Sequence, residues 1–157
     1  MDYKILLVDD HLVVKAGVSI ILNNEISDLA ICYASDYLET ISLIKINKYD
    51  LIILDINIPG GKSTAMIADI KAYLPDVKIL MFSAYEEESY ALRYIHAGAD
   101  GYLNKLSGED KIVEAVKAII STGKYLTEAI TTKLSDNHIN KGPINPSDKL
   151  SCSELQL

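Results

Sequence analysis

The chain has 157 residues and a net charge of −7, with 49% hydrophobic and 24% charged residues. This composition is typical of a globular protein, and the acidic excess argues against direct contact with nucleic acid, which requires clustered lysine and arginine. Because no apolar run approaches the ~20 residues of a membrane span, we expect neither a membrane segment nor a signal peptide.

The first part of the chain alternates short apolar runs with helical patterns. Residues 3–8 form a β-rich apolar run, and residues 12–22 are apolar almost all round, which suits a helix buried on most sides. Residues 29–34 predict a second strand. Ser35 or Asp36 can then cap a second helix, because both side chains accept hydrogen bonds from free backbone amides.

The third predicted strand ends in a single carboxylate. Residues 51–54 are all apolar and lead directly into Asp55, and Pro59 and Gly60 then mark a turn. A short apolar run of this kind predicts a strand that is buried on both faces, as in a parallel sheet. Open α/β sheets carry their chemistry at the carboxyl ends of such strands. We therefore interpret Asp55 as a carboxylate nucleophile that accepts a phosphoryl group.

The same alternation continues to about residue 122. The expected elements are a helix at 62–74 capped by Ser63, a strand at 77–82 ending at Ser83, a helix at 86–97 stopped by Gly98, a strand within 100–105, and a helix at 109–121 capped by Ser107. Five strands that alternate with five helices predict an α/β fold. We expect a flavodoxin-like, doubly wound, five-stranded parallel sheet of order 2-1-3-4-5 with five surrounding helices.

The C-terminal part has a different composition. Residues 125–134 suggest one more short helix, and residues 135–149 are polar with glycine and proline, which favours a flexible linker. Ser151 and Glu154 form a capping box that opens another helix, so we expect the natural protein to continue beyond Leu157. The expected domains are 1–122, a helix and linker at 123–149, and the start of a second domain at 150–157.

The two cysteines are far apart. Cys32 and Cys152 lack metal-ligand spacing, so we expect two free thiols in a reducing cytoplasm.

Polar residues follow several of the predicted strands at one edge of the sheet. Asp9 and Asp10 follow the first strand, which adjoins the third in this strand order, so they should converge with Asp55. Three carboxylates in one cleft repel each other and require a divalent cation, and hard oxygen ligands favour Mg²⁺. Lys105 and Ser83 are placed to contact the oxygens of a phosphoryl group.

These residues stand in motifs that resemble the receiver domain of two-component response regulators. The resemblance covers residues 3 to about 122 and rests on Val8-Asp9-Asp10-His11, Leu54-Asp55-x-x-x-Pro59-Gly60, Phe82-Ser83-Ala84 and Ala97-Gly98-Ala99-Asp100-Gly101-Tyr102-Leu103-x-Lys105. The tail Leu150-Ser151-x-x-Glu154 resembles the opening of a LuxR-type helix-turn-helix domain, as in NarL/FixJ-type regulators.

The resemblance implies a role for each site residue. It makes Asp55 the phosphoacceptor for a sensor histidine kinase, which would dock near the first helix and the loop after Asp55. Asp9 and Asp10 would hold Mg²⁺ together with Asp55 and the backbone carbonyl of Asn57.

The resemblance also implies a readout of phosphorylation. Ser83 and Lys105 would contact the phosphoryl group, and Tyr102 would be the switch aromatic, turning inward as Ser83 moves. The chain would then be a phosphoacceptor switch rather than an enzyme, with a possible homodimer, no membrane partner, and DNA bound only through the output domain that is absent from this chain.

The sequence departs from the family pattern at a few positions. Leu106 follows the lysine where many receivers have proline, and NarL/FixJ-type regulators commonly lack that proline. Ser63-Thr64 stand where a glycine is usual. Asn57 and Tyr85 occupy positions that tune adduct lifetime in the family, and a bulky Tyr85 predicts slow to moderate autodephosphorylation.

Three other functions compete with this interpretation. Gly60-Gly61-Lys62-Ser63-Thr64 imitates a nucleotide-binding P-loop, but Ile56 stands where that motif needs its first glycine. An aspartyl phosphatase would need an acid at Asn57 as its proton donor. A degenerate receiver that binds partners without phosphorylation is the third alternative, although all the expected site residues are present.

Overall fold

The computed structural model describes residues 2–85 and 87–141. Five strands are present: β1 (Tyr3–Val8), β2 (Leu29–Ala34), β3 (Leu51–Leu54), β4 (Lys78–Ser83) and β5 (Gly101–Asn104). Six helices accompany them in the described part of the chain: α1 (Leu12–Glu25), α2 (Tyr37–Ile46), α3 (Ala65–Tyr73), α4 (Glu87–His96), α5 (Glu109–Thr122) and α6 (Glu128–Lys141). The chain divides into two compact units, residues 1–126 and 127–157, so α6 belongs to the second unit.

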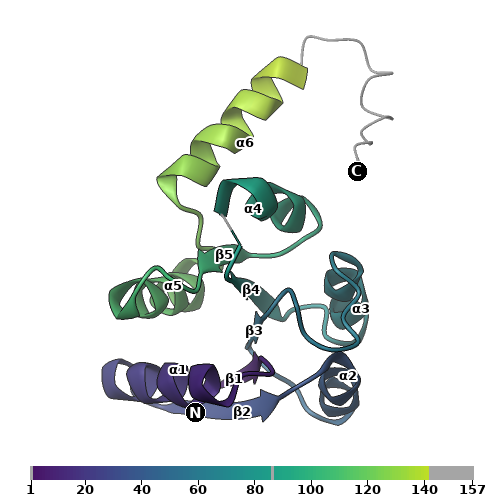
Figure 1. Cartoon of the computed structure of the whole chain (residues 1–157), viewed down its shortest axis with the longest axis vertical. Coiled ribbons are helices and arrows are strands. Elements are labelled where there is room, and N and C mark those ends of the chain that lie inside the picture. The colour runs from purple at the N-terminus through teal and green to yellow at the C-terminus, as the bar shows by residue number, and fades with distance from the viewer. Residues whose placement is uncertain (1, 86, 142–157) are drawn as a thin grey trace. The chain divides into compact units, whose positions relative to one another are not determined.

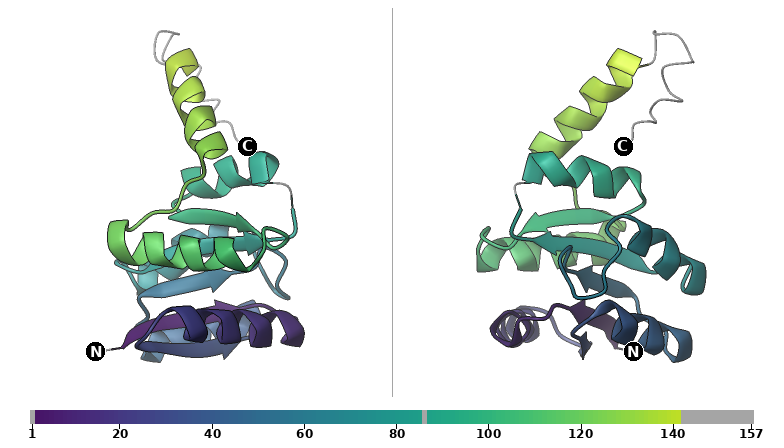
Figure 2. Two further views of the ribbon diagram at one scale, coloured as in Figure 1. Left: turned by 90° about the vertical axis from the view of Figure 1, so that its left-hand side faces the viewer. Right: turned by 45° about the vertical axis from the view of Figure 1, so that its right-hand side comes forward.

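The first unit is built on one parallel sheet. Its strand order is β2-β1-β3-β4-β5, and every neighbouring pair is parallel, as the sequence predicted. Helices α1 and α5 cover one face of this sheet, and α2 and α3 cover the other (Figure 1). Figure 2 shows the strands running in one direction between these layers, so their carboxyl ends share one edge.

The apolar runs in the sequence form the core of the sheet. All four residues of β3 are buried, as are the last four of β1, whereas the edge strand β2 is largely open. One cluster of buried side chains lies where α1 and α5 meet the sheet, and it includes Ile5, Leu7, Leu22, Ile53, Leu80, Val116 and Ile119. Burial on both faces is what a continuous apolar strand requires. The central position predicted for the Asp55 strand is confirmed.

The helix starts agree only partly with the predicted caps. Asp36 caps α2 by accepting a hydrogen bond from the Glu39 amide at 2.7 Å. Ser63 does not cap α3, because its backbone is left-handed with φ 56° and its hydroxyl meets Tyr94 Oη at 3.2 Å; the helix begins at Ala65. Ser107 does not cap α5 either, since Gly108 with φ 95° occupies that place. Both serine predictions were wrong because the chain turns one residue later than expected.

The linker predicted at 135–149 was wrong in its first part. Helix α6 runs from Glu128 to Lys141, well beyond the short helix expected at 125–134. Its sequence is polar, but no glycine or proline interrupts it before Gly142 and Pro143. Polar residues alone therefore did not end the helix. A helix is ended more effectively by proline or glycine, which disfavour the helical backbone conformation.

Several other expectations concern residues outside the described ranges. These are the rest of the linker, the capping box at Ser151 and Glu154, and Cys152; Cys32 is a free thiol. Within the described residues, no helix combines the length and apolarity that crossing a bilayer demands.

Candidate functional site

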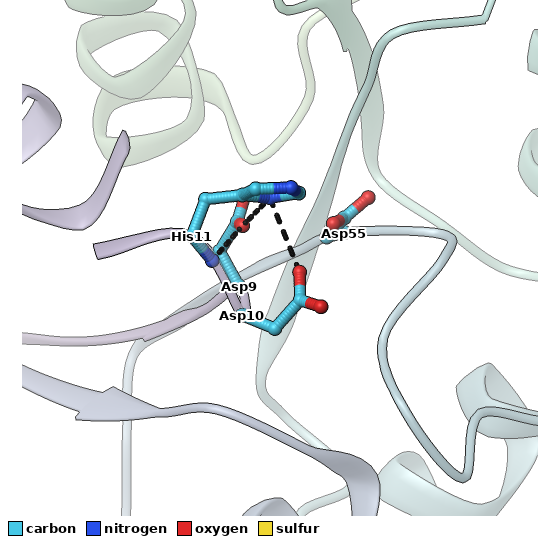
Figure 3. A group of neighbouring side chains, drawn as sticks. All are labelled: Asp9, Asp10, His11 and Asp55. Carbon is cyan, nitrogen blue, oxygen red and sulfur yellow. Dashed lines mark hydrogen bonds and ion pairs between the residues drawn. The ribbon is translucent and has the colours of Figure 1, made fainter. Parts of the chain in front are cut away.

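The strand register brings the predicted acidic residues together. Val8 of β1 pairs with Leu54 of β3, so the residues that follow them, Asp9 and Asp55, emerge side by side at the carboxyl edge. The Asp55 amide donates to the Val8 carbonyl at 3.0 Å, which extends the ladder by one step. Asp9, Asp10, His11 and Asp55 converge there (Figure 3), and their ligand atoms lie within 4.8 Å of one another.

His11 binds both carboxylates of the acidic pair. Its Nδ1 lies 2.8 Å from Asp9 Oδ1 and 3.1 Å from Asp10 Oδ1, and its backbone amide also donates to Asp9 Oδ1 at 2.8 Å (Figure 3). Sequence reasoning used His11 only as part of a motif and gave it no role. Its place directly after the acidic pair was the available signal.

Lys105 is the cation that faces the buried carboxylates. Its Nζ lies 2.7 Å from Asp9 Oδ2 and 3.2 Å from Asp55 Oδ2, and its side chain is only 14% exposed. The lysine follows β5, the edge strand two places from β3, so its long side chain spans the end of β4 to reach them. Its ammonium also lies 5.8 Å from the centre of the Phe82 ring. The sequence prediction that Lys105 belongs to this site is supported by these contacts.

Burial and charge shift the ionisation of these three groups in different directions. Burial disfavours the charged form of Asp9, but the Lys105 ammonium and the hydrogen bonds from His11 outweigh burial and hold the pKa of Asp9 below its ordinary value. For Asp55 burial dominates and raises the pKa, since the Asn57 amide and Lys105 only partly offset it. Burial would lower the pKa of Lys105, yet the two carboxylates raise it.

A second group of contacts fixes the loop after β4. Ser83 is buried, and its Oγ accepts a hydrogen bond from the Tyr85 amide at 3.0 Å. The Tyr85 hydroxyl accepts from Asn57 Nδ2 at 2.8 Å, while its ring stacks on Tyr90 with centroids 4.4 Å apart. Asn104 donates to the Tyr85 carbonyl at 2.9 Å. Asn104 is a site residue that sequence reasoning missed, because nothing in its motif marks it.

Tyr102 lies inside the protein rather than at the surface. Its side chain is 0% exposed on β5, where it pairs with Met81 of β4. The structure therefore places the Tyr102 side chain in the interior, and its role as a switch stays a prediction.

The P-loop alternative finds no support in the loop after β3. The Lys62 ammonium lies 5.9 Å from the centre of the Tyr37 ring, on the side of α2. A phosphate-binding lysine must instead point into the loop that cradles the phosphates.

The donor set suits a hard divalent cation. Asp9, Asp10 and Asp55 offer carboxylate oxygens, and Oδ2 of Asp9 is buried with only an ion-pair contact to Lys105 among the described residues. A cluster of carboxylates with room for water and phosphate oxygens is what Mg²⁺ prefers. The residues present therefore fit this ion.

A 2-1-3-4-5 parallel sheet with an acidic cluster and a lysine at its carboxyl edge defines a flavodoxin-like α/β fold with a candidate cation and phosphoryl site. Residues 5–117 match the family described as the response regulator receiver domain. The chain belongs to this family, and it is the receiver part of a two-component response regulator.

Individual relatives agree with this assignment. The chain is 30% identical to the oxygen regulatory protein NreC of Staphylococcus epidermidis over 151 residues, which is 96% of this chain and 68% of the relative. A LuxR-family response regulator from Aurantimonas matches with a TM-score of 0.76 and 26% identity, covering 88% of this chain and 99% of that one. The receiver domain of NarL from Mycobacterium tuberculosis matches with a TM-score of 0.69 and 26% identity over 77% of this chain and 98% of that one.

Proposed function

We propose that this chain is a phosphorylation switch in which Asp55 accepts a phosphoryl group from a sensor histidine kinase. The observation that carries the proposal is the Lys105 ammonium held between Asp9 and Asp55, at 2.7 and 3.2 Å. A buried lysine with two carboxylates provides a fixed positive charge beside a nucleophile. Charge neutralisation of this kind is the main requirement of phosphoryl transfer.

The transfer step follows from the groups at the site. A carboxylate oxygen of Asp55 attacks the phosphorus, the new O–P bond forms, and the bond from phosphorus to the donor's leaving atom breaks. The leaving group keeps the electron pair and takes up a proton, and Asp55 becomes an acyl phosphate. Lys105 and the Ser83 hydroxyl would each donate to a phosphoryl oxygen.

Asp9, Asp10, Asp55 and the backbone carbonyl of Asn57 would hold Mg²⁺. When bound, the ion would neutralise charge on the carboxylates and the phosphoryl group. The acidic cluster supports the assignment of the three carboxylates, since ligand atoms of Asp9, Asp10, Asp55 and the neighbouring His11 lie within 4.8 Å of one another.

An apolar surface beside the site suits a protein donor. Leu12 is 78% exposed and Val13 82% at the start of α1, and Leu106 is 86% exposed directly after Lys105. Large exposed apolar side chains near a reactive group favour docking of a partner protein. We propose that the kinase contacts these residues when it presents its phosphohistidine to Asp55.

The output would be transcriptional. Residues 1–122 would form the receiver, 123–149 a helix and linker, and 150–157 the opening of a LuxR-type helix-turn-helix domain that binds DNA. Phosphorylation would be read through Ser83 and Tyr102, and homodimerisation is one form this readout could take. The protein would act in the cytoplasm.

Intact-mass spectrometry after incubation with acetyl phosphate and Mg²⁺ tests the proposal. The wild type should gain one phosphoryl group, whereas Asp55→Asn and the wild type in EDTA should gain none. Beryllofluoride, a mimic of the bound phosphoryl group, should shift the amide NMR signals of the wild type and leave those of Asp55→Asn unchanged. If neither reagent alters the wild type, the chain is a degenerate receiver and the phosphorylation mechanism is wrong.

A further inference from the structure

Asn104 joins the two loops that carry the groups expected to bind the phosphoryl oxygens. It is the last residue of β5 and the register partner of Ser83, the last residue of β4. Its Nδ2 donates to the Tyr85 carbonyl at 2.9 Å, and its Oδ1 accepts from the Leu106 amide at 2.8 Å. One carboxamide thus connects the loop after Ser83 to the loop after Lys105.

The contact between Asn104 and Leu106 depends on the backbone N–H of Leu106. Proline has no N–H, but Leu106 does, and Oδ1 of Asn104 accepts it. The backbone on either side is also tied to β4, because the Lys105 amide donates to the Ser83 carbonyl at 2.7 Å. The lysine therefore leaves the strand between two fixed points.

The Tyr85 contact extends the same link to Ser83. The Tyr85 amide donates to Ser83 Oγ at 3.0 Å, and the Tyr85 carbonyl accepts from Asn104. Tyr85 therefore connects Asn104 to the serine hydroxyl. If the carboxamide were removed, both loops would lose a fixed contact. Small displacements of groups that bind a reacting centre have large effects on its stabilisation.

We propose that Asn104 is a positioning residue that holds Ser83 and Lys105 at the spacing needed to bind a phosphoryl group on Asp55. It acts through the two loops and does not touch the phosphoryl group or the metal. The inference rests on the proposed phosphoacceptor function and adds a residue to it.

The test is calorimetric titration of beryllofluoride in saturating Mg²⁺, with a separate Mg²⁺ titration. We expect Asn104→Ala to bind beryllofluoride about five-fold more weakly, which corresponds to one net hydrogen bond, and to bind Mg²⁺ as the wild type does. A merely structural role would not separate the two affinities. The matched control is Asn47→Ala, which removes an amide donor to the Leu43 carbonyl on α2 and should change neither affinity.

A second variant separates the two hydrogen bonds and also serves if the alanine variant fails to fold. In Asn104→Ser the hydroxyl can still accept from the Leu106 amide, as Ser83 does from Tyr85, but it is too short to reach the Tyr85 carbonyl. It should also bind beryllofluoride more weakly than the wild type. Wild-type affinity in Asn104→Ser, or equal losses of beryllofluoride and Mg²⁺ in Asn104→Ala, would overturn the proposal. If the wild type did not bind beryllofluoride, the phosphoacceptor function itself would be refuted.

Discussion

Lys105 lies closer to Asp9 than to Asp55, with its Nζ 2.7 Å from Oδ2 of the first and 3.2 Å from Oδ2 of the second. The lysine therefore neutralises a residue of the expected metal site as well as the expected phosphoacceptor. Both carboxylates are almost fully buried, with side chains 1% and 5% exposed. Without this cation, the two charges would face each other in a site of low polarity.

Replacing the lysine should reveal this repulsion. Lys105→Met should lower the free energy of unfolding in EDTA by about 3 kcal/mol, because it leaves buried carboxylates without their counter-charge. Added Mg²⁺ should recover part of the loss, since it binds the same groups in the folded state only. Urea denaturation with and without Mg²⁺ measures both effects. Lys111→Met, at an exposed ion pair with Glu114 of 3.5 Å, is the control and should cost less than about 0.5 kcal/mol.

Asp10 should contribute to metal affinity more than to stability. Its side chain is 37% exposed and its partner is His11 at 3.1 Å, so its replacement leaves the core intact. Asp10→Asn should weaken Mg²⁺ binding by at least about ten-fold, the effect typical of even an outer metal contact. Calorimetric titration checks the value. Asp76→Asn makes the same charge change at an exposed loop position, and an equal loss there would show a general electrostatic effect instead.

Tyr85 should protect the phosphorylated form from water. Its hydroxyl is held by Asn57 and its ring stacks on Tyr90, which places an aromatic side chain over the loop next to Asp55. Tyr85→Ala should hydrolyse the acyl phosphate about five-fold faster, equal to about 1 kcal/mol of barrier. The decay of the phosphorylated mass after removal of acetyl phosphate gives the rate. Tyr85→Phe keeps the ring, and its rate of acyl-phosphate hydrolysis should lie between those of the wild type and Tyr85→Ala. Loss of the wild-type adduct within seconds would contradict the shielding role.

Alkaline pH should weaken the fold through Tyr3, which is partly buried, and Tyr37, which is buried. Burial, with the charges of Asp50 and Asp100, raises the pKa of Tyr3 to about 12, and burial with the hydrogen bond to Asp69 raises the pKa of Tyr37 as well. Tyrosine in the unfolded chain ionises near pH ~10. The unfolded chain therefore releases its phenolic protons first, and the stability these groups contribute is complete below that pH and is lost as the pH rises through their folded pKa values.

Tyr37→Phe tests this dependence. At pH 7 the variant should lose about 1 kcal/mol, because the 2.7 Å hydrogen bond from Tyr37 to Asp69 is removed. At pH 11 the variant and the wild type should differ less in their free energy of unfolding. Only the wild type has a phenol at position 37, and its ionisation in the unfolded chain lowers the stability of the wild type alone. Urea denaturation at the two pH values measures the difference. A gap that stays constant or widens would mean that Tyr37 is not protected from ionisation.

The strands could be predicted from the sequence because apolar runs depend mainly on burial. The apolar run at 51–54 predicted a central strand, and every residue of β3 is buried. The carboxyl-end positions of Asp9, Asp55, Ser83 and Lys105 followed from strand boundaries, and the topology brings these strand ends to one edge. The predicted caps at Ser63 and Ser107 failed because a cap depends on backbone angles that tertiary contacts impose.

By itself, the sequence determined the parallel α/β sheet, its strand order and the residues of the acidic cluster. The parallel sheet was predicted from the alternation of apolar runs with helical patterns, and the strand order was taken from the flavodoxin-like fold that this alternation indicates. The acidic cluster was predicted from the side chains that follow the runs. Only the tertiary structure decided that Lys105 pairs with Asp9 as well as Asp55, that His11 joins the acidic pair, and that Asn104 links two loops. The contacts of Lys105 with Asp9 and Asp55, and of Asn104 with Tyr85, join residues that lie at or just after the ends of different strands, so their distances are set by the packing of the sheet; the contacts of His11 are local and depend on the turn that follows β1.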